Sequence, residues 1–166
     1  RSAIVDELRT HAADPRWRVR EGVAMALQRV GDADMGRLLA ITVDWIDDRP
    51  YVQRAAVAAI AEPRLLKDGS AASTAVDVVD RVTESLAAQA LEDRPSDEFR
   101  TLRQALAYCW SVIVVAAPER GKSRMEYWAQ SADPDVRWVI REHLKKTRLL
   151  RLDPAWANSL RSRLTG

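Results

Sequence analysis

The sequence has little of what crosslinks a chain or interrupts regular structure, with one cysteine, six glycines and seven prolines. The single Cys109 excludes an internal disulfide framework. Scarce glycine and proline favour long regular segments with short connections. No apolar run approaches the roughly 18–20 residues that span a bilayer, and a run such as 112–117 has the length of a core segment. Because no signal-peptide pattern is present, we expect a cytoplasmic protein that does not enter a membrane.

The residue types of common metal and catalytic sites are also sparse. The two histidines, His11 and His143, lie far apart in sequence, with no cysteine or carboxylate at ligand spacing. The Gly-Lys-Ser segment at 121–123 lacks the preceding glycine and strand of a phosphate-binding loop. Cys109 falls on an apolar helix face, which favours a small core residue over a nucleophile. We therefore expect no metal, no cofactor and no catalytic residue, and we lean towards a protein that is not an enzyme.

What the sequence does have is the composition of one helical domain. Its 166 residues are 47% hydrophobic and 30% charged, which fits a folded chain with a continuous core. Ala, Arg and Leu are among the most frequent residues, and all three are good helix formers. No stretch alternates apolar and polar residues over a strand's length. The prediction is an all-α protein.

Two segments of the sequence are nearly alike and define a repeat. Asp-Pro begins both 14–20 and 133–137, and both contain Val followed by Arg. In each, Asp can accept the free amide protons of a helix's first turn and Pro can occupy the first helical position. Weaker copies lie at 47–60 and 95–113. The apolar anchors of the four copies are, in order, Val19, Val52, Phe99 and Val136.

This repeat resembles the second helix of a HEAT repeat. The resemblance implies a right-handed α-solenoid of about four antiparallel helix pairs, near 1–30, 31–61, 70–117 and 118–150, with a closing helix at 154–164. It also implies that the Arg after the anchor bridges to an Asp of a neighbouring repeat. Those residues are Arg20, Arg100 and Arg137, while Gln53 departs from the pattern. The anchors and their stripes should be buried, including Val19, Leu27, Val136 and Ile140.

Basic residues concentrate towards the end of the chain. Residues 120–166 carry eleven basic and five acidic side chains, whereas residues 1–119 carry a net negative charge. Arg137, Arg141, Lys145 and Arg148 would project from one side if a helix runs on to Leu150. Such a ridge could neutralise several phosphates of a nucleic acid. The alternative is an ordinary solvated helix face.

The sequence contains six tryptophans, most of which we expect in the core between stacked helices. Trp17 and Trp138 lie off the main stripes, and we expect them to be partly exposed in a groove. Segments 51–56, 133–144 and 153–156 resemble repeats of HEAT-like bacterial DNA alkylation-repair glycosylases. That resemblance implies a basic groove with tryptophans that hold a cationic base. It also implies a carboxylate such as Asp44 or Asp48 that stabilises the sugar cation.

Two main hypotheses for function follow. The first is a non-catalytic scaffold that recognises a protein partner on the concave face, and its rival is a DNA-binding, DNA-repair-like module. A third, a stabilising helical domain of a longer protein, rests only on the first residue not being Met. A continuous positive groove would favour DNA, and a mixed or apolar groove would favour protein. The candidate binding residues are Arg16, Trp17, Arg20, Arg100, Arg137, Trp138, Arg141, Lys145 and Arg148.

Overall fold

The computed structural model describes residues 2–165, and within them the regular structure is entirely helical, which confirms the all-α class. No helix of this described part is long and apolar enough to cross a membrane. The α-helices are α1 (Ala3–Ala12), α2 (Trp17–Ala33), α3 (Met35–Trp45), α4 (Pro50–Ile60), α5 (Gly69–Ala88), α6 (Asp97–Ala116), α7 (Pro118–Trp128), α8 (Pro134–Leu144), α9 (Thr147–Leu152) and α10 (Pro154–Thr165). Two short 3-10 turns, η1 (Pro63–Leu65) and η2 (Leu91–Asp93), flank α5.

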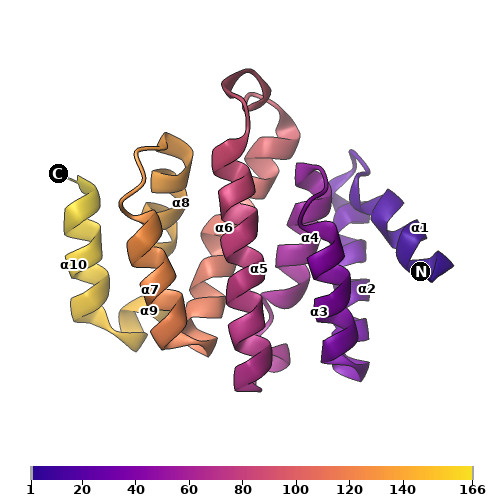
Figure 1. The fold of residues 1–166 in the computed structure, drawn as a ribbon, viewed down its shortest axis with the longest axis horizontal. Coiled ribbons are helices and arrows are strands. Elements are labelled where there is room, and N and C mark those ends of the chain that lie inside the picture. The colour runs from indigo at the N-terminus through magenta and orange to yellow at the C-terminus, as the bar shows by residue number, and fades with distance from the viewer. Residues whose placement is uncertain (1, 166) are drawn as a thin grey trace.

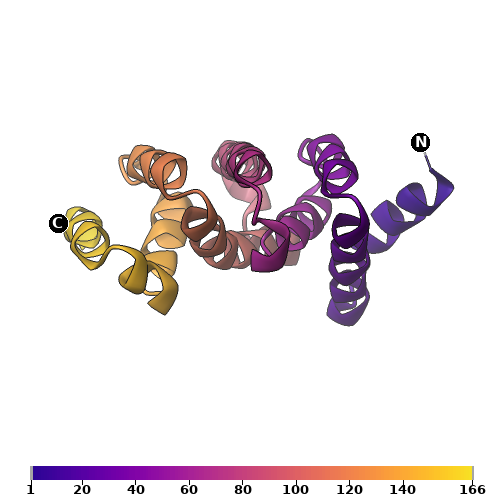
Figure 2. The ribbon, with the colours of Figure 1, turned by 90° about the horizontal axis from the view of Figure 1, so that it is seen from below.

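The helices form two layers along one row (Figures 1 and 2). Helices α3, α5 and α7 lie side by side in one layer, and α2, α4, α6 and α8 lie in the other. Each helix of the first layer is followed in the chain by its partner in the second, with short connections. The core therefore lies between the layers and runs the length of the row.

A side-chain cap is present at the helix start in two of the four copies of the repeat. The Asp133 side chain accepts hydrogen bonds from the backbone N–H groups of Asp135 and Val136, and Pro134 begins α8 as predicted. The Ser96 hydroxyl similarly accepts from the Phe99 amide at the start of α6. The copies at 14–20 and 47–60 lack a side-chain cap, and they differ in that α4 begins at Pro50 whereas α2 begins only at Trp17.

Three of the four residues that we expected in the core are confirmed as buried. Leu27, Val136 and Ile140 are fully buried, and so are the tryptophans of α3 and α6, Trp45 and Trp110. Val19 is only partly buried, contrary to expectation. Helix α2 lies at the end of the second layer, so its first turn lacks the neighbour that covers the later anchors.

Candidate binding groove

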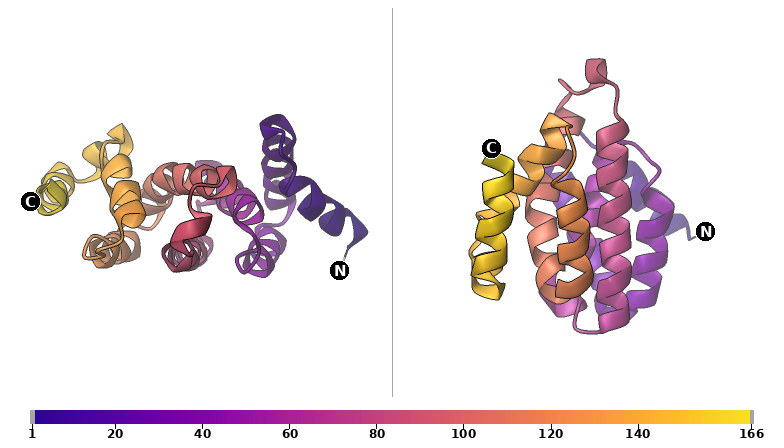
Figure 3. Two further views of the ribbon diagram at one scale, coloured as in Figure 1. Left: turned by 90° about the horizontal axis from the view of Figure 1, so that it is seen from above. Right: turned by 60° about the vertical axis from the view of Figure 1, so that its left-hand side comes forward.

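The second layer has a hollowed outer face. In Figures 2 and 3, α2 near one end and α9 near the other project beyond α4 and α6, which lie between them. Two adjoining hollows lie on this face, and both have α6 side chains in their walls. Their α6 residues recur every three or four positions, so they form one stripe along the helix: Thr101, Gln104, Ala105, Tyr108, Cys109, Val112, Val115 and Ala116. We call the two hollows together the α6 groove.

The first hollow is polar and has a volume of about 520 Å³. Glu21 and Gln28 line it from α2, and Arg54 lines it from α4. The Arg54 Nη2 lies 2.8 Å from a Glu21 carboxylate oxygen. Its Nη1 is buried and has no hydrogen-bond partner among residues 2–165. A buried N–H without an acceptor costs roughly 1–3 kcal/mol, so this end of the groove favours a ligand that offers an acceptor.

The second hollow is apolar and has a volume of about 320 Å³. Its apolar walls come from η1 and the residue after it and from the last turns of α6: Pro63, Leu66, Val112, Val115 and Ala116. Two cations, Lys67 and Arg148, also line it. Within the described residues, no carboxylate forms an ion pair with either cation. The Arg148 guanidinium lies 4.9 Å from the centre of the Tyr108 ring, which lines the first hollow, and so connects the two.

The arginines that follow the anchors, which we expected to bridge to an Asp of a neighbouring repeat, have different partners. Arg20 Nη1 donates to the backbone oxygens of Asp14 and Pro15, both at 2.8 Å. Arg100 donates likewise to Pro95 at 2.9 Å, and Arg137 to Ser131 at 3.4 Å. Each arginine thus holds the turn that precedes its own helix, and a bridge to an Asp of the neighbouring pair is not what the structure shows.

Gln53, which departs from the arginine pattern, also donates a hydrogen bond to the turn that precedes its own helix. Its Nε2 donates to the Ile46 backbone oxygen at 2.7 Å and to the Ser85 hydroxyl at 2.8 Å. The position after each anchor therefore supplies a side-chain donor to the preceding turn, whether it is Arg or Gln. These side chains satisfy turn carbonyls that would otherwise lack a donor, which makes them structural.

In the ion pairs between neighbouring helix pairs, the arginines come from positions outside the repeat pattern. Arg94, which is largely buried, lies 2.8 Å from carboxylate oxygens of both Asp133 and Asp135. Arg103 pairs with Asp135 at 2.6 Å, and its guanidinium lies 4.5 Å from the centre of the Trp138 ring. Trp138 is therefore partly covered by this network. Sequence reasoning missed these pairs because Arg94 and Arg103 occupy no repeated position.

The predicted basic ridge is not continuous. Helix α8 ends at Leu144 and α9 begins at Thr147, so the helix does not run on to Leu150 as the ridge required. Arg137 also donates to the Leu164 backbone oxygen at 3.1 Å, and Lys145 lies 2.7 Å from the Glu142 carboxylate. Only Arg148 of the expected four lines the α6 groove, while Arg141 lies partly buried on α8.

Arg16, Trp17 and Arg20 gather at a separate hollow of about 500 Å³ at the start of α2. The Trp17 side chain is 63% exposed, and the Arg18 guanidinium lies 5.3 Å from the centre of one of its rings. Arg16 forms an ion pair with Asp14 at 2.7 Å. Asp14 has a pKa well below its usual value because the Arg16 side chain and backbone both donate to it.

The carboxylates suggested by the glycosylase resemblance do not line the α6 groove. Asp44 and Asp48 lie at the end of α3 and in the following turn, where Arg9 of α1 binds both, at 3.2 and 2.5 Å. This pairing joins the first two helix pairs. The geometry therefore gives these carboxylates a structural partner.

The remaining candidate chemical groups are buried. Burial raises the pKa of the Cys109 thiol to about 12, so the neutral thiol is the stable form. Burial lowers the pKa of His143 to about 3. Within residues 2–165, no group of His, Cys, Asp and Glu is arranged to hold a metal ion.

Comparisons of the chain with family models, with curated proteins and with solved structures found no match.

Proposed function

We propose that this chain is a HEAT-like α-solenoid that binds a protein partner on its concave face and catalyses no reaction. The support is the two-layered row of helix pairs, α1–α2, α3–α4, α5–α6 and α7–α8, with α9 and α10 closing it. The repeated Asp-Pro and Val-Arg positions follow the HEAT pattern. In a right-handed solenoid of this kind the second helices line the concave surface, which here corresponds to α2, α4, α6 and α8.

The single observation that carries the proposal is the mixed lining of the α6 groove. A DNA-binding groove needs a run of cations that neutralise successive phosphates. Here Glu21 and Glu62 line the first hollow together with Arg54, and the second hollow is mostly apolar. Two large side chains remain exposed on α6, Tyr108 at 46% and Val115 at 40%. Exposed aromatic and apolar side chains beside polar ones are typical of protein-recognition surfaces.

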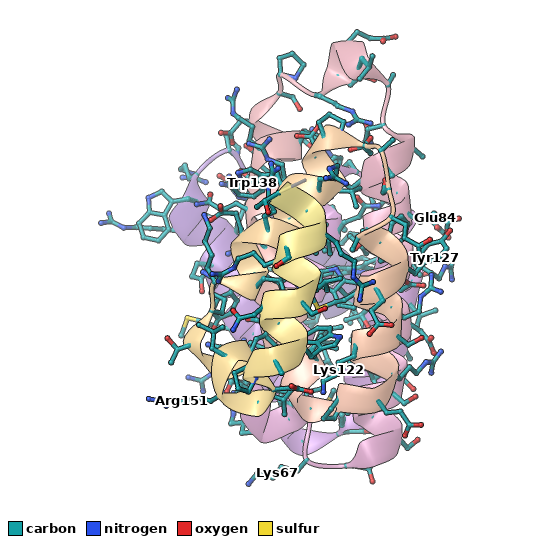
Figure 4. The ribbon with its side chains drawn as sticks, turned by 90° about the vertical axis from the view of Figure 1, so that its left-hand side faces the viewer. Lys67, Glu84, Lys122, Tyr127, Trp138 and Arg151 are labelled. Carbon is teal, nitrogen blue, oxygen red and sulfur yellow. The ribbon has the colours of Figure 1, made fainter. Side chains whose placement is uncertain are left out.

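Site-specific crosslinking tests this proposal. A photoreactive phenylalanine analogue would replace Tyr108 in the groove, and the control would carry it at Tyr127 of α7, which is comparably exposed at 53%. Figure 4 shows Tyr127 beside Glu84 on the opposite side of the molecule from Arg151 of α9. We expect a discrete protein adduct from position 108 that excess wild-type chain competes away. Equal adducts from both positions, or none from position 108, would contradict the proposal.

DNA binding remains the second candidate function, and one observation favours it. In the last part of the chain, ion pairs hold several of the acidic side chains, with Glu142 held by Lys145 and Asp153 by Lys122. Several exposed or partly exposed cations there have no acidic partner among the described residues: Arg141, Lys146, Arg151 and Arg163. A duplex-binding titration at about 50 and 200 mM salt distinguishes the candidates, because phosphate neutralisation weakens steeply with salt.

A further inference from the structure

We infer that the α6 groove recognises a partner segment in which an apolar residue stands next to Asp or Glu, with the carboxylate bound between Lys67 and Arg148. This inference rests on the proposed function and names the chemistry of the partner. It concerns the second hollow, where apolar walls meet two cations that have no acidic partner among residues 2–165.

The walls of the second hollow select an apolar side chain. Leu66 and Val112 are buried beneath its surface at 4% and 3% exposure, while Val115 stays 40% exposed. Covering this surface with an aliphatic or aromatic side chain would remove it from water, which favours binding. A purely polar partner would forgo that gain.

The charges around the same hollow select an acid. Arg64, which lies between Pro63 and Leu66, is already held by Asp32 at 2.9 Å and by Glu62 at 3.3 Å. In the part of the chain that the structure describes, Lys67 and Arg148 have no such carboxylate. Tyr108 covers part of the Arg148 guanidinium, and the N–H groups along its edge suit a carboxylate, which can accept two of them.

Lys67 lies at the outer rim of this end of the molecule. Figure 4 shows the Lys67 and Arg151 side chains both extending outwards at the same end, away from Trp138. The charged side chains that line the apolar hollow, Lys67 and Arg148, are both cations, whereas Glu21 and Glu62 line the first hollow. The groove is polarised along α6, and a bound segment has its acidic residue at the α9 end.

The first hollow extends the contact along the helix. Residues 101–116 of α6 span about 22 Å at 1.5 Å per residue, enough for a bound segment of roughly four helical turns or seven extended residues. At the far end, the buried Arg54 Nη1 has no hydrogen-bond acceptor among residues 2–165. A carbonyl or side-chain oxygen of the bound segment would supply that acceptor. The contacts for the segment's apolar residue, its acidic residue and its hydrogen-bond acceptor therefore all lie along the α6 groove.

The test is a selection of 16-residue random peptides displayed on phage against three forms of the chain. These are the wild type, the charge-reversed K67E/R148E variant and a control, R37E/R163E, which makes the same change in charge at residues that line neither hollow. We expect the wild type and the control to enrich peptides with Leu, Ile, Phe or Met beside Asp or Glu. K67E/R148E should instead enrich the apolar residue beside Lys or Arg. This reversal is a gain of binding, so an unfolded variant cannot imitate it.

The best wild-type peptide is then measured by fluorescence anisotropy. We expect K67E/R148E and V115E each to weaken its binding at least about tenfold, and R37E/R163E to change it less than about twofold. Circular dichroism confirms that each variant is folded.

Different failures have different meanings. Peptides whose binding is weakened by V115E but that contain no acid, or whose binding survives K67E/R148E, would overturn this inference and leave the proposed function standing. Absence of any enriched peptide, or enriched peptides whose binding survives every groove variant, would overturn both. A duplex oligonucleotide that binds through Lys67 and Arg148, with no peptide enriched, would replace the acidic segment with a polyanion.

Discussion

The two best copies of the repeat are nearly the same in sequence and differ in structure. At 133–137 the Asp caps its helix, the Pro begins it and Val136 is fully buried. At 14–20 the helix begins two residues after the Pro, and Val19 stays partly exposed. The copy at 133–137 has neighbours on both sides, and Arg94 of the preceding helix pair contacts it, whereas the copy at 14–20 lies near the end of the row. The comparison shows that the motif starts a helix, while its neighbours determine how much it stabilises the fold.

The largest expected difference between the copies concerns their ion pairs. Arg94→Ala would leave Asp133 and Asp135 without their shared cation in a largely buried site, and should lower the free energy of unfolding by about 3 kcal/mol. Arg16→Ala removes the corresponding exposed partner of Asp14 and should change stability little. Urea denaturation of both variants measures the contrast. Equal losses would mean that the surroundings of the two copies do not matter.

The histidine near each copy gives a pH-dependent test. Burial lowers the pKa of His143 to about 3 in the folded chain, below its usual value near 6.5. Between these values the unfolded chain binds the proton and the folded chain does not. Stability should therefore rise with pH across this window and fall by about 1.4 kcal/mol for each unit of acidification.

His143→Leu should flatten this dependence, whereas His11→Leu should leave it intact, because His11 is exposed. Unfolding curves at about pH 5 and pH 6.5 give the comparison. A His143→Leu variant with the wild-type pH profile would show that another group is responsible.

Cavity-forming substitutions compare the two anchors directly. Val136→Ala removes two buried methyl groups and should cost about 2 kcal/mol, whereas Val19→Ala should cost less than about 1 kcal/mol because its side chain already meets solvent. Thermal melts with circular dichroism would rank them. The opposite order would show that α2 is covered at its first turn in solution.

The smallest expected effect concerns DNA. We expect R141A/K145A, near the copy at 133–137, to change the affinity for duplex DNA as little as R16A/R18A, near the copy at 14–20. The reason is that a groove with mixed charges offers no continuous row of cations for the phosphates. Fluorescence anisotropy at several salt concentrations measures both. A salt slope that falls by about two units only in R141A/K145A would favour the DNA-binding candidate.

Much of the local structure follows from short-range patterns. Capping by Asp133 and the proline at the start of α8 could be predicted because they depend on backbone amides a few residues away. The exposure of Trp17 could be predicted too, since it lies off the apolar stripe. The donor role shared by Arg20, Gln53 and Arg100 was detectable as a repeated position, but its partner was not, because carbonyl orientation in a turn leaves no trace in residue identity.

The sequence by itself determined the all-α class and the apolar stripes, because helical periodicity and propensity are local properties. Tertiary structure alone decided which side chains line the α6 groove. Glu21, Arg54, Tyr108 and Arg148 come from four different helices and share no motif. It also decided that the helix expected to reach Leu150 ends at Leu144, so that α9 packs across α6 and brings Arg148 over Tyr108. Contacts between distant segments depend on how stacked helices curve, and that curvature arises from packing summed over the whole row.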